Sequence, residues 1–210
     1  MELVLHPVYF PNVSTLRCLL EPAVWEVWDN FQKQTFRNRC YICTDRGRHM
    51  LNIPIRHVGG KTGRQRYRDV RIDNTYPWQR QHWRSLETAY RSAPFFEYYE
   101  PELAPLFEKR HKWLMEWNLE TTAILCRLAG LPFPESKTDR YVAVPKGSRD
   151  MRPLVNAKTA TEAGFPPYPQ VFMERTGFVP NLSGLDLLFN EGNQAGDYIR
   201  ACALPKPANR

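Results

Sequence analysis

The hydrophobic and polar positions of the chain repeat with two periods, one typical of strands and one typical of helices. Residues 3–11 begin as a short apolar strand and run into a loop that contains prolines. Asn12 and Ser14 are common helix N-caps, so a short helix is expected to follow. Residues 24–28 are β-branched and aromatic, which predicts a second strand. This order is that of a βαβ unit, whose ligands usually lie beyond the carboxyl ends of its strands.

Two more strands are predicted at residues 36–42 and 50–55. The turn-forming residues 44–48 between them indicate an antiparallel hairpin, and its arginines make that hairpin basic. Residues 69–73 alternate between apolar and polar side chains, as in a further strand. From residue 78 to residue 91, apolar side chains recur at helical spacing, which predicts an amphipathic helix.

The C-terminal half is predicted to be mostly helix and loop. The longest helical pattern covers residues 102–130 and stops at a glycine, with a proline soon after. Residues 146–169 are rich in proline, alanine, lysine and threonine, which predicts a long loop or flap. A capped short helix is expected at residues 181–189.

These elements together predict one α/β domain. We expect residues 1–204 to form a single domain, with a mixed sheet that has a βαβ start, a basic hairpin and packed helices. Residues 205–210 are expected to be a frayed tail. The length of 210 residues suits one domain with a sizeable core.

Composition and charge narrow the class of protein. Hydrophobic residues make up 42% and charged residues 24% of the chain, which excludes collagen-like, coiled-coil and wholly disordered proteins. The net charge of +7 favours an anionic partner that carries phosphate or carboxylate, or a nucleic acid. No apolar run approaches the roughly 20 residues of a membrane helix, so we expect no membrane span and a cytoplasmic protein.

The chain lacks the common signatures of metal and nucleophile sites. Its five cysteines are scattered and odd in number, so free thiols are expected rather than a disulfide framework. Cys40 and Cys43 have the CxxC spacing, but no second Cys or His pair follows at zinc-site distance. The sequence contains no nucleophile elbow, phosphate loop or HExxH motif. We therefore predict no metal site, and the sequence indicates no cofactor.

A dense run of polar side chains precedes and enters the predicted hairpin. Arginine offers a planar fork for carboxylate or phosphate, and amide side chains add hydrogen bonds that discriminate by shape. A solvated, charged edge strand is the alternative interpretation of the same pattern. The ligand-binding residues predicted from this run are Gln32, Lys33, Arg37, Asn38 and Arg39.

His82 and Glu87 are the candidate catalytic pair on the predicted helix at residues 78–91. Histidine can act as a general acid or base near neutral pH, and a carboxylate can orient it. A lone helical histidine is more often a structural hydrogen-bonding residue. His6, near the end of the first strand, has only its position to support a role in a site.

Residues 33–91 carry fourteen lysines and arginines against four acids. Such basic density interleaved with aromatic residues also suits nucleic acid, because arginines neutralise phosphate and aromatic rings stack on bases. No nucleic-acid-binding motif is recognisable, and a solvated basic face explains most of these charges. Nucleic-acid binding is therefore the least favoured function.

Several strings resemble the bacterial WbqC-like family, and the match covers nearly the whole chain in order. The strings are QKQTFRNRCYI at 32–42, LNIPI at 51–55, WQRQHWRSLETAY at 78–90, PFFEYY at 94–99 and FVPNLSGLDLLFNEG at 178–192. The family takes its name from a member encoded among O-antigen polysaccharide genes, which implies a cell-envelope or glycoconjugate context. The resemblance implies no established reaction.

Three functions of different classes follow. The first is an enzyme of envelope-glycan or O-antigen biosynthesis, a transferase of an acyl or aminoacyl group to a sugar acceptor. The second is a non-catalytic module that binds a sugar nucleotide or another anionic ligand, and nucleic-acid binding is the third. The partner expected from the first two is an anionic small molecule or an activated sugar. We expect Gln32, Arg37, Asn38 and Arg39 to converge with His82 on one anion-receiving pocket near the rim of the sheet.

Overall fold

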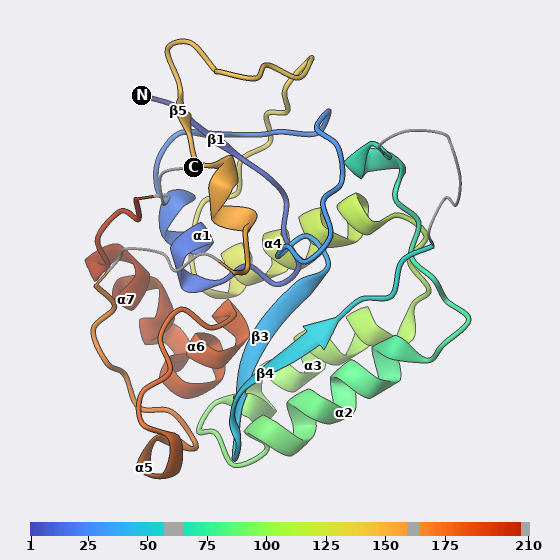
Figure 1. The fold of residues 1–210 in the computed structure, drawn as a ribbon. Coiled ribbons are helices and arrows are strands. Elements are labelled where there is room, and N and C mark those ends of the chain that lie inside the picture. The colour runs from blue at the N-terminus through green and yellow to red at the C-terminus, as the bar shows by residue number, and fades with distance from the viewer. Residues whose placement is uncertain (57–64, 159–163, 207–210) are drawn as a thin grey trace.

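The computed structural model describes residues 1–56, 65–158 and 164–206 as a mixed α/β fold (Figure 1). A three-stranded parallel sheet has β1 (Leu3–Leu5) at its centre, between β2 (Ala23–Trp25) and β5 (Arg149–Asp150). Helix α1 (Val13–Cys18) connects β1 to β2 and is capped by the Asn12 side chain, which accepts the Thr15 N–H. The predicted βαβ start is confirmed.

The basic hairpin is a separate antiparallel sheet of two strands, β3 (Arg39–Thr44) and β4 (Gly47–Asn52). The register pairs Arg39 with Asn52 and Thr44 with Gly47. The turn is shorter than the predicted loop at 44–48, because Gly47 adopts a φ of +85° and lets the chain reverse over two residues. Both strands therefore differ from their predicted bounds.

The helical prediction is confirmed at α2 (Trp78–Tyr90) but is wrong for residues 102–130. That stretch belongs to α3 (Phe96–Glu108) and α4 (Leu114–Leu128), with a break between them. Lys109 is extended, and the chain then pairs with residues 70–72 through a hydrogen bond from the Leu114 N–H to the Val70 carbonyl. The break coincides with a run of four basic residues that interrupts the apolar pattern.

Short elements complete the chain. A 3₁₀ turn, η1 (Tyr67–Asp69), stands where part of a strand at 69–73 was predicted. The segment 146–169, expected to be a loop, contains β5 and the turn η2 (Arg152–Val155), while its residues 159–163 lie outside the described part. The remaining elements are α5 (Met173–Thr176), α6 (Gly184–Glu191), η3 (Gly192–Gln194) and α7 (Ala195–Ala201). The prediction at 181–189 thus corresponds to α6, whose N-cap is Ser183.

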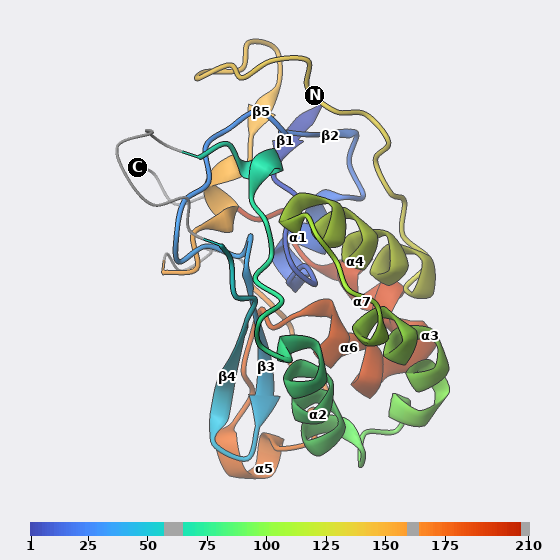
Figure 2. The ribbon, with the colours of Figure 1, turned by 90° about the vertical axis from the view of Figure 1, so that its right-hand side faces the viewer.

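One aromatic-rich core joins these layers. Figure 2 shows the hairpin along one side of the molecule, α2 and α6 beside it, α3 on the opposite side, and the small parallel sheet at one end. Trp25, Trp78 and Trp117 are all fully buried in this core. Because the core covers one end of the parallel sheet, polar groups at the strand ends are removed from water.

Candidate functional site

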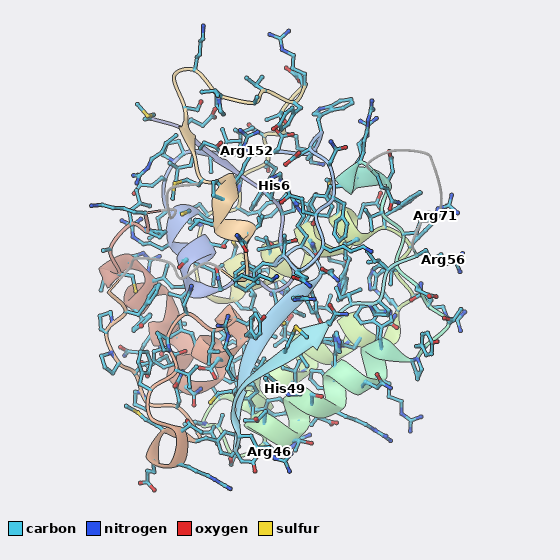
Figure 3. All side chains as sticks on the ribbon, in the orientation of Figure 1. His6, Arg46, His49, Arg56, Arg71 and Arg152 are labelled. Atoms are coloured by element: carbon cyan, nitrogen blue, oxygen red, sulfur yellow. The ribbon has the colours of Figure 1, made fainter. Side chains whose placement is uncertain are left out.

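The residues that follow the three parallel strands form a buried polar cluster. His6 comes directly after β1 and Glu26 directly after β2, while Arg152 comes two residues after the end of β5. All three side chains are buried (Figure 3 labels His6 and Arg152). β2 and β5 lie on opposite sides of β1, so the strand order changes direction at β1. In open α/β sheets, ligands bind beyond the carboxyl ends of the strands at such a position.

His6, Asp29 and Arg37 meet at the centre of this cluster. The Arg37 Nη2 atom lies 2.7 Å from His6 Nε2 and 3.3 Å from Asp29 Oδ2. His6 Nε2 and Asp29 Oδ2 are 3.1 Å apart. One guanidinium nitrogen therefore holds both the imidazole and the carboxylate.

The groups around His6 determine the tautomer and the protonation state of its ring. Its Nδ1 lies 3.3 Å from the Glu26 carbonyl, which can only accept, so Nδ1 carries the hydrogen and Nε2 accepts from Arg37. Burial, and then the positive charge of Arg37, lower the pKa of His6 to about 4, although contacts with Asp29 act in the opposite direction. His6 is therefore a neutral hydrogen-bonding group at pH 7 rather than the cation of an ion pair.

Asp29 is the member of the trio that solvent reaches, with 18% of its side chain exposed. Burial would raise the pKa of its carboxyl. At the low pH where this carboxyl titrates, however, His6 is protonated, and its contact with Asp29, the charge of Arg37 and the Asn30 N–H outweigh burial and lower that pKa to about 2. The carboxylate is thus ionised at neutral pH. It can accept hydrogen bonds from a ligand and is a weak base.

Arg37 has buried donors without acceptors. Its side chain is 1% exposed, and its Nε and Nη1 atoms have no hydrogen-bond partner among the described residues. The guanidinium carbon lies 5.2 Å from the centre of the Tyr67 ring, and burial lowers the pKa of Arg37. Asn118 fixes the backbone here by donating to the Arg37 carbonyl at 2.6 Å and to the Tyr67 hydroxyl. Unpaired buried N–H groups are costly, which makes these donors candidates for ligand oxygens.

Glu26 and Arg152 form the adjacent, more fully paired half of the cluster. Arg152 donates two hydrogen bonds to the Asp150 carboxylate, from Nε at 2.8 Å and from Nη2 at 2.7 Å. It also donates to two backbone carbonyls, and its Nη1 lies 3.5 Å from Glu26 Oε2. The other Glu26 oxygen accepts the Trp28 N–H at 2.7 Å. A surface cavity of about 520 Å³ opens beside Glu26 and the loop at residues 137–148. Glu26 lines this cavity together with Lys137.

The predicted catalytic pair does not form a dyad. His82 is buried, its Nδ1 lies 2.9 Å from the Tyr9 hydroxyl, and its pKa is lowered to about 4 mainly by burial. The Glu87 carboxylate instead pairs with Arg91 at 3.2 Å. A catalytic role for His82 and Glu87 stays a prediction, and the structure gives His82 the contacts of a core residue.

The predicted ligand-binding residues separate into three environments. Arg37 turns into the cluster, whereas Asn38 and Arg39 both bond Asn52 Oδ1, at 3.1 Å and 3.3 Å. The His82 ring also contacts the backbone of Asn52, the residue to which Asn38 and Arg39 donate. Gln32 and Lys33 are exposed in the loop before β3. Arg37 and Arg39 do not lie on one strand, because β3 begins only at Arg39.

Sequence reasoning did not select Glu26, Asp29 or Arg152 as site residues, and gave His6 only positional support. The signal that could have found His6 and Glu26 is the strand-end rule, since they directly follow β1 and β2, but the prediction at 24–28 placed Glu26 inside the second strand. Arg152 belongs to residues 146–169, which were predicted to be a loop, so the strand-end rule could not be applied to it. These residues come from distant parts of the chain, so their spacing alone does not join them.

The described residues contain neither a metal-binding cluster nor a membrane-spanning helix. No group of three or more His, Cys, Asp or Glu residues in this part of the chain is arranged to hold a metal ion. No helix within residues 1–56, 65–158 and 164–206 is both long and apolar enough to cross a membrane.

Comparison with known proteins gives a family and no reaction. An uncharacterised Mycobacterium tuberculosis protein, Rv1507c, is 30% identical over 211 residues, which cover 84% of this chain and 87% of that protein. No solved structure matches the chain significantly. The model of the WbqC-like protein family matches residues 7–163, a range that includes Asp29, Arg37 and Arg152. The chain therefore belongs to the WbqC-like protein family.

Proposed function

We propose that this protein is a transferase of cell-envelope glycan assembly that moves an acyl or aminoacyl group onto an amino-sugar acceptor. The acceptor binds at the His6–Asp29–Arg37 cluster. The observation that carries the proposal is a solvent-accessible carboxylate beside a buried guanidinium that retains free donors. The glycan context rests on the family resemblance.

The charge balance of the cluster favours a sugar over a simple anion. Asp29 and Glu26 are carboxylates at this site, and Asp150 is a third, against the two guanidinium groups of Arg37 and Arg152. A phosphate group placed within the cluster itself would meet more negative than positive charge. A ligand with an ammonium group for Asp29 and hydroxyl or carbonyl oxygens for Arg37 satisfies both kinds of group.

The transfer needs an activated acyl donor, such as a thioester or an acyl phosphate anhydride, as its second substrate. The acceptor nitrogen forms a bond to the acyl carbon, and the bond from that carbon to the leaving group breaks with its electron pair. Before this attack the acceptor ammonium loses one proton to water, which frees the lone pair of its nitrogen, and the second proton lost by that nitrogen passes to the leaving group. Neither Asp29 nor His6 has a pKa near neutrality, so positioning of the acceptor is the contribution of this cluster.

The test compares two sugars that differ in one group. Binding of a nucleotide-activated amino sugar and of the matching sugar with a hydroxyl in place of the amine is measured by calorimetry. The wild-type protein should prefer the amine by about tenfold, because Asp29 accepts a charged hydrogen bond from it. Asp29→Asn should remove the preference, whereas Asp45→Asn, at the exposed hairpin turn, should keep it.

Turnover separates the two leading functions. With thioester, acyl-adenylate and aminoacyl-ester donors supplied in turn, mass spectrometry should detect the acylated amino sugar. Binding that depends on Asp29 but yields no product with any donor class would favour the second candidate, a non-catalytic sugar-nucleotide module. That candidate is supported by the absence of a base of suitable pKa in the described cluster. Equal binding of both sugars by wild type and Asp29→Asn would contradict both.

A further inference from the structure

A small basic pocket lies on a different part of the surface, where three extended segments meet. The pocket has a volume of about 170 Å³. Its cationic side chains come from residue 56, residue 71 and the break between α3 and α4. They are Arg56, Arg71, Arg110 and Lys112, and Ile72, Asn74 and His111 complete the lining.

Backbone pairing places two of the arginines side by side. Ile55 bridges Ile72 in an antiparallel pair, and the Arg56 N–H donates to the Arg71 carbonyl at 2.9 Å. Arg56 and Arg71 are therefore cross-strand neighbours on the face opposite the two isoleucines. Figure 3 shows both at the same edge of the molecule. Like charges in such a pair repel each other unless something of opposite charge binds between them.

A third segment adds the cations Arg110 and Lys112 to the pocket, and its Trp113 ring contacts two of the pocket's cations. Arg71 bridges Trp113 in a second antiparallel pair, and the Ile72 N–H donates to the Lys112 carbonyl. The Arg71 guanidinium lies 5.1 Å and the Lys112 ammonium 4.9 Å from the Trp113 ring centre. These cation–π contacts hold the two charges at the mouth of the pocket without neutralising them.

The walls of the pocket are fixed by side chains that are not cations. Asn74 donates to the His111 carbonyl at 2.8 Å and accepts the Trp78 indole N–H at 3.1 Å. The His111 ring packs on Trp117 with a centroid distance of 3.9 Å. The pocket is therefore preformed, and binding does not first have to order its backbone.

Acids do not neutralise the four cations. No salt bridge joins Arg56, Arg71, Arg110 or Lys112 to an acid within the described residues. Asp73 lies close enough to Arg56 to feel its charge, but its carboxylate accepts the Thr75 hydroxyl at 2.7 Å and the Thr75 N–H at 3.0 Å. Glu120 lies 3.6 Å from the His111 ring.

We propose that this pocket binds a phosphate group of a small phosphorylated ligand, with Arg56 and Arg71 as its principal contacts. Four positive side chains around so small a volume suit one compact, highly charged anion, and guanidinium groups bind phosphate in a planar fork. A nucleic acid requires a stripe of charge several phosphates long. The inference stands independently of the proposed function, because no residue is shared with the His6–Asp29–Arg37 cluster.

The experiment titrates the protein with inorganic pyrophosphate by calorimetry at fixed ionic strength. We expect one site, with Arg71→Gln and Arg56→Gln each weakening binding about tenfold. Arg46→Gln is the matched control, because it removes the same charge from the exposed hairpin turn, away from the pocket in Figure 3. That control should bind pyrophosphate as tightly as wild type does. Asp29→Asn should also bind pyrophosphate as wild type does, whatever its effect on sugar binding, because Asp29 does not line this pocket.

Three results would overturn the proposal. The first is equal weakening by Arg46→Gln and Arg71→Gln, which would mean a response to net charge rather than a site. The second is the absence of binding at about 1 mM pyrophosphate. A single-stranded oligonucleotide is titrated in parallel, and its tighter, steeply salt-dependent binding would assign the basic surface to nucleic acid and contradict a compact phosphate site.

Discussion

Two buried neutral histidines should make this protein lose stability as the pH falls below about 6.5. The pKa of His6 and that of His82 are both lowered from 6.5 to about 4, chiefly by burial. Between these values the unfolded chain binds a proton at each histidine and the folded chain does not. The contribution of these two histidines to the free energy of unfolding therefore decreases as pH falls through this window and is constant above it.

The size of the loss follows from the shift. A shift of about 2.5 pH units corresponds to about 3 kcal/mol per histidine, with a slope near 1.4 kcal/mol per pH unit for each. The two together are a large part of the roughly 5–15 kcal/mol by which a typical domain is stable. This sets an acid-unfolding transition well above the pH at which Asp29 is protonated.

Urea denaturation at about pH 7, 6 and 5 measures this dependence. The quantity compared is the slope of the free energy of unfolding against pH, because His82→Asn also removes the hydrogen bond to Tyr9 and therefore lowers stability at every pH. The slope should be smaller than that of wild type by about 1.4 kcal/mol per pH unit in His82→Asn, and by the same amount in His6→Asn. His49→Asn, at an exposed position on β4, should keep most of the wild-type slope. Slopes of His6→Asn and His82→Asn equal to that of wild type would refute the reasoning.

Other outcomes test the packing around this fold. Gly196→Ala should destabilise the protein by about 1–3 kcal/mol in thermal unfolding, because its Cβ would lie 2.2 Å from the Ala129 carbonyl oxygen; wild-type stability would show that α7 can shift. Tyr90→Phe should cost about 1–3 kcal/mol in urea, since its hydroxyl donates to the buried Asp186 at 2.6 Å and accepts the Cys43 N–H, and a loss below a few tenths would contradict this contact. A thiol reagent should modify no cysteine until urea unfolds the chain, since burial raises the thiol pKa of all five; rapid native labelling of any one would disprove its burial.

The sequence predicted elements where a single periodic pattern decides the structure. The helix at 78–90 has an uninterrupted apolar face, and its prediction holds to within one residue. The helix expected at 102–130 fails because local periodicity does not reveal that residues 109–113 leave the helix to pair with residues 70–72. The hairpin is present, but its register depends on the positive φ of Gly47, which permits a tighter turn than the one expected.

The site was less predictable than the fold, since it depends on long-range contacts. Arg37 was selected because of the polar run around it, and it is the member of that run that enters the cluster. His6 and Asp29, its partners, are 31 and 8 residues away in sequence. No spacing rule joins such positions, and for His6 only its place near the end of the first predicted strand indicated a site.

The most direct test of the central claim is a crystal structure of the protein with a nucleotide-activated amino sugar. We expect the sugar at the carboxyl ends of β1 and β2, with its amine within hydrogen-bond distance of the Asp29 carboxylate. A ligand oxygen should accept from Arg37 Nε or Nη1, the donors that lack partners among the described residues. An ordered sugar bound elsewhere, with His6, Asp29 and Arg37 in their present contacts, would contradict the assignment of this cluster as the acceptor site.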